Sequence, residues 1–222
     1  LYEKLISLIE KSNSDCAVLS NYIVNESDKI QFNDGQKITA ARALDLLLKF
    51  KFPTSVWAYL YKKSVISDIR LNKNIHFYED LVFNARTLLN SNYVSLCAED
   101  LYFYRQHSAS TNSQGLNVKR LSCLDIPEIL KDYLYSSGND GLIEKLKFLE
   151  AYLIVSALDP IKLPFLEPDL GYIKSVSKKA RKSLATIVFS KAVPLKFKIY
   201  IFLASLNLKI STRVKDYITL RT

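Results

Sequence analysis

The chain has 222 residues, of which 49% are hydrophobic and 24% are charged, and its formal net charge is +9. This balance excludes an intrinsically disordered chain, and the length allows one large or two small domains with a buried core. Neither G-x-G-x-x-G nor G-x-x-x-x-G-K-[ST] occurs among the 5 glycines, which excludes the common Gly-rich phosphate loops. No apolar run approaches the roughly 18 residues that a membrane span needs, so we expect no segment to cross a membrane by itself.

The first half of the chain alternates helix and strand signals. Apolar residues at helical spacing predict a helix over 1–11, and the β-rich run 16–24 predicts a buried strand. The elements expected next are a strand over 29–32, a turn over 33–35, a helix over 39–50, a β-rich or irregular aromatic segment over 55–61, a short helix over 62–69, a helix from about residue 79, and strands over 93–98 and 101–105. This order predicts an α/β or α+β fold with a mixed sheet, and we adopt the α/β class.

Strand signals fade after about residue 118. Helices are predicted over 118–135, with Pro127 as a break, and over 140–157, 172–188 and 196–218. We therefore expect two domains. Residues 1–113 would hold the mixed sheet with its flanking helices, and residues 114–222 would form an α-helical C-terminal region.

The three cysteines, Cys16, Cys97 and Cys123, are widely spaced and form no C-x-x-C pair. This spacing argues against a zinc site or a thioredoxin-like redox pair. We predict that all three are reduced residues in or near the core of a protein from a cytosolic compartment.

The positive charge is concentrated at the end of the chain. Residues 174–222 contain twelve Lys and Arg and one acidic residue, Asp216, whereas residues 1–173 carry a net charge of −2. Basic residues mixed with aromatic ones on an apolar helix are typical of a protein that lies on an anionic membrane surface. A basic solvent face on a packed helix would give the same pattern. A nucleic-acid partner is not expected, because no known motif supports it and the rest of the chain is slightly acidic.

Two adjacent acids, Glu79 and Asp80, follow a β-prone run and begin a helical pattern. Free backbone N–H groups and the helix dipole favour negative charge at a helix start, so both residues are readable as ordinary first-turn residues. The alternative is that a strand–helix junction aims a catalytic carboxylate into a cleft. The residues alone leave both interpretations open.

Three segments occur in an order that matches a known family: Val56–Lys63 (VWAYLYKK), Phe77–Phe83 (FYEDLVF) and Leu101–Ser110 (LYFYRQHSAS). They resemble the acceptor-side half of bacterial family 2 glycosyltransferases with the GT-A fold. In that family a W-x-K-L-Y segment precedes an E-D-x-x-F helix start, and a Y-Y-R-x-H-x-x-S strand end follows. Residues 1–24 also resemble the helix and strand that follow the family's metal-binding D-x-D. The resemblance covers about residues 1–112.

The resemblance implies an inverting glycosyltransferase. Such an enzyme moves a sugar from a nucleotide-diphosphate-sugar donor to a glycan or lipid-linked acceptor in capsule, exopolysaccharide or cell-wall synthesis, with Mg²⁺ or Mn²⁺ as cofactor. Together with the basic tail, it implies a cytoplasmic protein that is peripheral at the inner face of the plasma membrane.

The resemblance also assigns roles to individual residues. Asp80 matches the general base that takes the proton of the acceptor hydroxyl, and Glu79 would position it or hold the acceptor. Trp57 matches an aromatic residue near the sugar, Arg105 would neutralise the charge of the leaving diphosphate, and His107 would be a metal ligand or touch the diphosphate. Apart from the resemblance, Trp57 is readable as a core residue and His107 as a surface residue. In the same way, Arg105 is readable as an ion-pair partner of an acid such as Asp100.

The sequence departs from the family pattern in two places. Tyr59 stands where the family has the lysine of W-x-K, and no D-x-D occurs in the chain. We therefore expect the donor-binding half and most of the metal ligands to lie outside this chain, which alone would be inactive. The alternative function is a non-catalytic, helical and basic module that binds a membrane or a partner and carries a transferase remnant.

Overall fold

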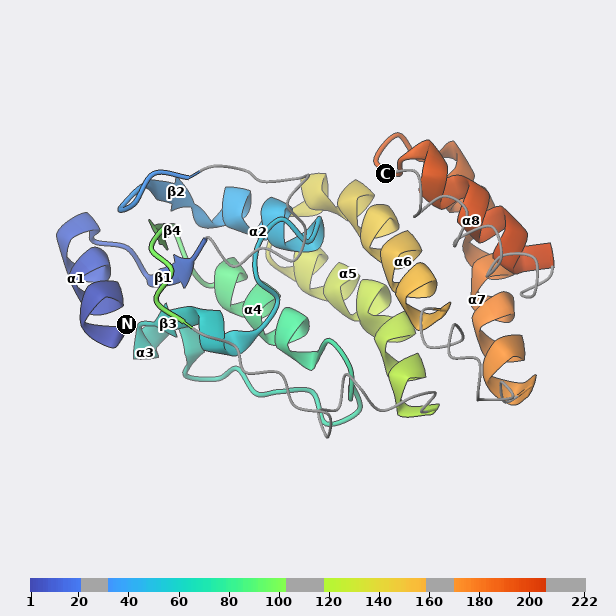
Figure 1. Cartoon of the computed structure of the whole chain (residues 1–222), viewed down its shortest axis with the longest axis horizontal. Helices are drawn as coiled ribbons and strands as arrows, with labels where there is room; N and C mark the ends of the chain where they lie inside the picture. The colour runs from blue at the N-terminus through green and yellow to red at the C-terminus, as the bar shows by residue number, and fades with distance from the viewer. Residues whose placement is uncertain (21–31, 103–117, 159–169, 207–222) are drawn as a thin grey trace. The chain divides into compact units, whose positions relative to one another are not determined.

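The computed structural model describes residues 1–20, 32–102, 118–158 and 170–206 (Figure 1). The chain divides into two compact units. Unit 1 comprises Leu1–Lys73, Tyr78–Arg105 and Asp132–Asp140, and unit 2 comprises Asn74–Phe77, Gln106–Lys131 and Gly141–Thr222. The expected domain boundary at residues 113 and 114 lies outside the described residues.

Within its described residues, unit 1 contains a four-stranded sheet in the order β2-β4-β1-β3. The strands are β1 (Cys16–Leu19), β2 (Lys37–Thr39), β3 (Tyr59–Tyr61) and β4 (Tyr93–Cys97). The central pair, β1 and β4, is parallel, and the edge strands β2 and β3 pair antiparallel with their neighbours. The prediction of an α/β protein with a mixed sheet is confirmed at this level.

Helices cover both faces of the sheet. Helix α1 (Tyr2–Ser12) contacts β1, β3 and β4, while α2 (Ala40–Leu48) contacts β2 and β4, and α4 (Glu79–Leu89) packs on α2. Figure 1 shows α1 on one side of the strands and α2 with α4 on the other. All four residues of β1 are buried, as expected of a central strand that is covered on both faces.

The register of the strands defines the carboxyl end of the parallel pair, which is called the carboxyl edge of the sheet here. Leu19 and Cys97 end the parallel pair side by side, and β3 runs in the opposite direction, with Val18 opposite Tyr59. The 3-10 turn Val56–Ala58, which leads into β3, therefore lies beside the carboxyl end of β1. In open α/β sheets, ligands bind at the carboxyl ends of the parallel strands.

Two short elements of unit 1 differ from the sequence-based expectation. Strand β2 was not predicted, because three residues with exposed ends carry little periodicity and pair only through their contact with β4. Of the strand expected over 101–105, the described residues Leu101 and Tyr102 lie in no strand. The strand expected over 29–32 falls almost entirely outside the described residues. The short helix expected over 62–69 is present as α3 (Lys63–Ile66).

Unit 2 is helical in its described part. Its elements, which include the first part of α5, are the 3-10 helix Val118–Asp125, α5 (Ile126–Ser136), the 3-10 turn Asp140–Leu142, α6 (Ile143–Leu158), α7 (Leu170–Phe189) and α8 (Leu195–Leu206). The expected break is present within two residues of Pro127, because the 3-10 helix ends at Asp125 and α5 begins at Ile126. Pro127 lies in the first turn of α5, where its missing N–H is not needed, and the change from 3-10 to α-helix comes just before it.

Helices α6, α7 and α8 pack on one another. Tyr172 of α7 is buried and donates a hydrogen bond to the Ala157 carbonyl of α6 at 2.8 Å. Glu150 of α6 accepts a hydrogen bond from Ser183 and forms an ion pair with Lys179 at 3.3 Å, which fixes α7 along α6.

The structure also bears on the predictions for the cysteines and for membrane-spanning helices. Cys16, Cys97 and Cys123 are free thiols and are buried, as expected. Among the described residues, every helix is too short or too polar to pass through a bilayer.

Candidate functional site

Asp80 is the second residue of α4 and is held against the turn that precedes β3. Its Oδ2 accepts a hydrogen bond from the Val56 backbone N–H at 3.1 Å. This contact places the start of α4 at the carboxyl edge of the β1–β4 pair. The other carboxylate oxygen of Asp80 has no hydrogen-bond partner among the described residues.

Burial raises the pKa of the Asp80 carboxyl above its ordinary value, and the hydrogen bond from Val56 offsets part of that rise. A half-buried carboxylate with a raised pKa is a stronger proton acceptor than an exposed one. This property suits a general base and is common at catalytic sites.

Asn84, which follows Asp80 by one helical turn in α4, binds the same segment before β3. Its Nδ2 donates to the Thr54 carbonyl at 2.7 Å, and its Oδ1 accepts a hydrogen bond from the Tyr61 hydroxyl. Asn84 is fully buried, so these bonds satisfy polar groups that would be costly to leave unpaired. Asp80 and Asn84 thus hold this segment at three residues: Thr54, Val56 and Tyr61. Sequence reasoning did not single out Asn84, although its i+4 spacing from Asp80 places both on one helix face.

Two aromatic residues beside the acids have left-handed backbone conformations. Tyr78 is the N-cap of α4 with φ 64°, and Phe50 follows the end of α2 with φ 55°. Their rings meet edge to face with centroids 5.6 Å apart. A left-handed conformation costs a bulky residue about 1–2 kcal/mol, and such outliers cluster at functional sites. The contact between the rings holds the backbone that positions Glu79 and Asp80.

Trp57 lies in the turn that Asp80 holds. Its indole stacks on the Tyr102 ring, with centroids 4.2 Å apart and planes 15° from parallel. It is half-buried rather than part of the core. Tyr102 covers one face of the indole. The stack brings the turn before β3 and the residues that follow β4 together, which their separation in the sequence does not reveal.

The remaining predicted site residues have different outcomes. Glu79 opens α4 beside Asp80, is half-buried, and has no side-chain partner among the described residues. Arg105 and His107 lie outside the described residues. Tyr59, which replaces the family lysine, is buried in the core and donates to the Pro53 carbonyl at 2.8 Å. This position therefore holds the turn and presents no cation to a phosphate.

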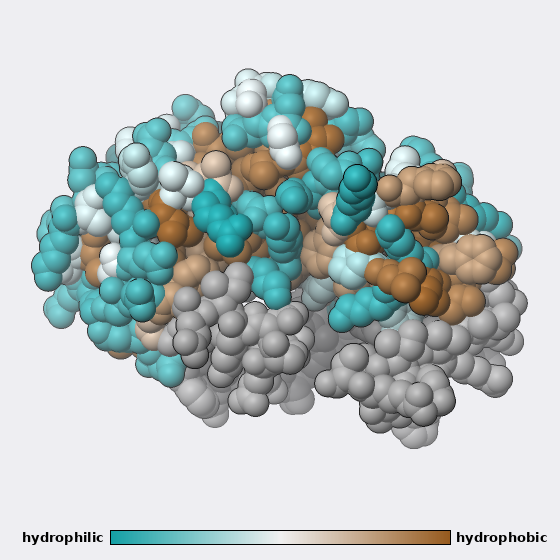
Figure 2. Space-filling view, turned by 90° about the horizontal axis from the view of Figure 1, so that it is seen from above, coloured by the Kyte–Doolittle hydropathy of each residue, from teal (hydrophilic) through white to brown (hydrophobic). Residues whose placement is uncertain are grey.

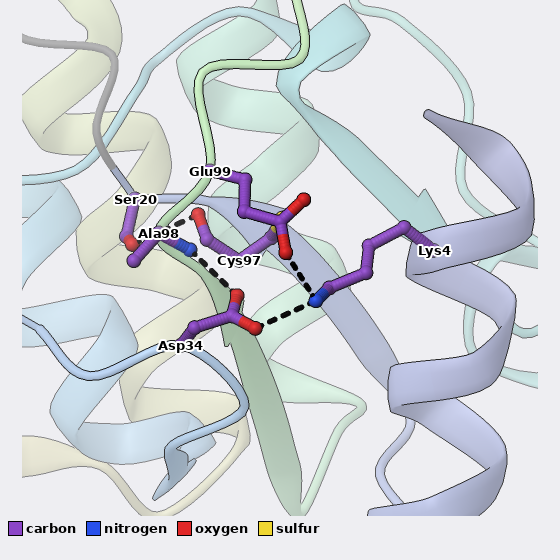
Figure 3. Close-up of polar contacts among 6 residues, drawn as sticks. All are labelled: Lys4, Ser20, Asp34, Cys97, Ala98 and Glu99. Atoms are coloured by element: carbon purple, nitrogen blue, oxygen red, sulfur yellow. Dashed lines mark hydrogen bonds and ion pairs between the residues drawn. The ribbon is translucent and has the colours of Figure 1, made fainter.

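A second polar cluster lies at the same edge, on the α1 side of the sheet (Figure 3). Lys4 of α1 forms ion pairs with Asp34 and Glu99, and Asp34 accepts a hydrogen bond from the Ala98 N–H at 3.1 Å. Lys4 lowers the pKa of the Asp34 carboxyl below its ordinary value. Since each charge is partnered, this cluster is a fastening between α1 and the loops that follow β4 and precede β2.

No group of three or more His, Cys, Asp and Glu side chains within the described ranges is arranged to hold a metal ion. The described residues therefore do not fit the Mg²⁺ or Mn²⁺ of the resemblance as a complete site. His107, the one residue of this chain that the resemblance assigns as a metal ligand, lies outside the described residues.

Comparison of the chain with protein-family models finds no family that matches, and comparison with curated proteins finds no match either.

Proposed function

We propose that this chain carries the acceptor-side site of an inverting family 2 glycosyltransferase with a GT-A fold, and that Asp80 is its general base. The donor is a nucleotide-diphosphate-sugar, and the acceptor is a glycan or lipid-linked glycan in capsule, exopolysaccharide or cell-wall synthesis. The observation that carries the proposal is Asp80 itself. One of its oxygens is anchored by the Val56 N–H, the other is free of partners in the described chain, and its pKa is raised by burial.

The geometry supports one defined step. The acceptor oxygen attacks the anomeric carbon, the bond from that carbon to the diphosphate breaks, and its electron pair leaves with the nucleoside diphosphate. The hydroxyl proton passes to the free oxygen of Asp80. Because the hydroxyl becomes acidic only as the new bond forms, a positioned carboxylate suffices as the base.

The neighbouring residues take supporting roles in this proposal. Trp57 and Tyr102 form an aromatic surface on which the apolar face of a sugar can stack. Glu79, which has no side-chain partner among the described residues, would accept a hydrogen bond from an acceptor hydroxyl. Arg105 would neutralise leaving-group charge, and His107 would contribute to a Mg²⁺ or Mn²⁺ site whose main ligands lie outside this chain.

The test is the substitution Asp80→Asn in the full-length gene product, with sugar transfer from nucleotide-sugars as the measurement. We expect transfer to fall about 10²- to 10⁴-fold, because the amide cannot take the proton. The fold should persist, since the amide oxygen can still accept the Val56 hydrogen bond. In the unmodified protein, transfer should fall as the pH drops through the raised pKa of Asp80, because only the deprotonated carboxylate acts as base.

Asp68→Asn is the matched control, since Asp68 is an exposed aspartate of unit 1. It should leave both transfer and its pH profile unchanged. If Asp80→Asn transfers sugar as fast as the unmodified protein, Asp80 is not the base, and the non-catalytic alternative becomes the better reading.

A further inference from the structure

Helix α8 is apolar on two opposite faces. Its buried face includes Tyr200, Ile201 and Ala204 and packs within unit 2. The opposite face is a line of four exposed apolar residues, here called the outer stripe: Leu195, Ile199, Phe202 and Leu206. These residues recur at i, i+4, i+7 and i+11, which places them along one side of the helix. A helix that is apolar all round is normally buried on all sides.

The end of α7, just before the turn to α8, carries further exposed apolar residues. Val188 and Phe189 at the end of α7 are exposed, and Phe189 is 86% accessible. In Figure 2, brown apolar side chains gather among teal polar ones over α7 and α8, at the right of the view. A contiguous exposed apolar surface with a polar rim marks a place where something binds.

The rim of the outer stripe is positively charged. Lys196 and Lys198 lie on either side of it along α8, and Lys191 lies in the turn. Residues 174–206 contain eight Lys and Arg and no acidic residue. Lysine stems can lie along an apolar surface while their ammonium groups reach outward.

The positive charge around the outer stripe indicates which kind of partner binds there. A second copy of the same face would bring lysines against lysines. Residues 207–222 are a poor match for the same reason, since they carry four further Lys and Arg and one acidic residue. An anionic bilayer surface matches both features. Its negative headgroups attract the lysines, and the apolar layer beneath them accommodates the outer stripe.

We propose that the α7–α8 turn and the outer stripe form a contact surface for an anionic membrane. The 12 residues of α8 span about 18 Å at 1.5 Å per residue, well short of a bilayer core of about 30 Å. The helix therefore lies in the headgroup layer with the outer stripe facing the acyl chains. This proposal does not rest on the transferase assignment.

The test is co-sedimentation of the full chain with phosphatidylcholine vesicles that contain or lack phosphatidylglycerol. We expect binding to the anionic vesicles that weakens as salt is raised from about 0.15 M to about 1 M, where charges are screened within a few ångströms. The double variant Leu195→Ser/Phe202→Ser should bind about 10- to 100-fold more weakly, because it removes buried apolar area.

The triple variant Lys191→Gln/Lys196→Gln/Lys198→Gln tests the charge. At about 1 kcal/mol for each lysine near an anionic surface, binding should fall about 100-fold and lose its preference for phosphatidylglycerol. The matched controls lie on unit 1 and should bind like the unmodified chain. They are Leu71→Ser, which changes a half-exposed leucine, and Lys11→Gln/Lys63→Gln/Lys73→Gln, which changes three exposed lysines.

Three results would overturn the proposal. The first is a full chain that does not bind anionic vesicles. The second is full binding by the Leu195→Ser/Phe202→Ser variant, which would move membrane contact elsewhere. The third is an oligomer, detected by light scattering, that this variant dissociates without any change in vesicle binding, because the outer stripe would then be an interface between copies of the chain.

Discussion

Helices α4 and α8 present polar groups in different ways. In α4, the side chains of Asp80 and Asn84 are tied to backbone groups of a turn that lies 24 and 30 residues earlier in the chain. In α8 and the turn before it, Lys191 and Lys198 have no ion-pair partner among the described residues, and they lie beside exposed apolar residues. The first arrangement fixes single atoms in place. The second leaves a broad surface whose parts act together.

The difference indicates what kind of ligand each region suits. A reaction needs a carboxylate held to within a fraction of an ångström, so internal hydrogen bonds are spent on positioning it. A fluid surface such as a bilayer demands no fixed geometry, and an exposed apolar stripe flanked by lysines is sufficient. The comparison therefore predicts localised effects of substitution in α4 and cumulative effects in α8.

The largest effect on folding should come from the buried face of α8. Ile201 is fully buried and Ile199 is 41% exposed, although they lie two residues apart on one helix. Ile201→Ala should lower the free energy of unfolding by about 2–5 kcal/mol, whereas Ile199→Ala should change it by less than about 0.5 kcal/mol. Urea unfolding measures both. An equal cost at the two positions would show that the outer stripe is buried in solution.

A smaller loss of folding free energy is expected where Asn84 of α4 binds the segment before β3. Asn84→Ala leaves the Thr54 carbonyl and the Tyr61 hydroxyl without their partner, and should cost about 2–3 kcal/mol. Asn90→Ala, at the exposed end of the same helix, is the control and should cost less than about 1 kcal/mol. Urea unfolding of the two variants decides the matter. Similar losses in both would mean that Asn84 is not the fastening that the geometry indicates.

The smallest effect on stability should appear at the exposed cluster of Lys4, Asp34 and Glu99. Because Lys4 lowers the pKa of Asp34, this carboxyl stabilises the fold above its ordinary pKa of 3.8, and that contribution is lost as the pH falls through the lower folded value. Lys4→Met should therefore lower the urea midpoint slightly near neutral pH and leave it unchanged in strong acid. Lys11→Met on the same helix is the control. A Lys4→Met deficit that persists unchanged in strong acid would contradict this explanation.

Much of the fold was accessible from sequence because the long elements have clear periodicity. The helices α1, α2, α4, α6 and α7 lie close to their predicted bounds, and the strand predicted over 93–98 is present as β4. Strand β2 was missed because its three residues form a strand only through pairing with β4. The order of the strands depends on contacts between distant segments and has no local signal.

The candidate site was predicted in part. Asp80 and Trp57 came from the resemblance, and they do lie at neighbouring points of one edge. Asn84 was missed because a single asparagine in a helix looks like a solvent-facing residue, and its partner Thr54 lies 30 residues away. Tyr102 was part of a quoted motif, but its stacking on Trp57 could not be inferred from a separation of 45 residues.

The parallel pair β1–β4 also has a consequence for how the protein is made. Its two strands lie more than seventy residues apart, and the carboxylate of Asp15, just before β1, accepts hydrogen bonds from the Asn92 and Tyr93 N–H groups. Contacts between distant residues form slowly, and the N-terminal part of a chain leaves the ribosome first. During synthesis β1 can therefore pair with β3 and pack on α1 before β4 is available, and the carboxyl end of the parallel pair, near Asp80, is completed only when Cys97 has emerged.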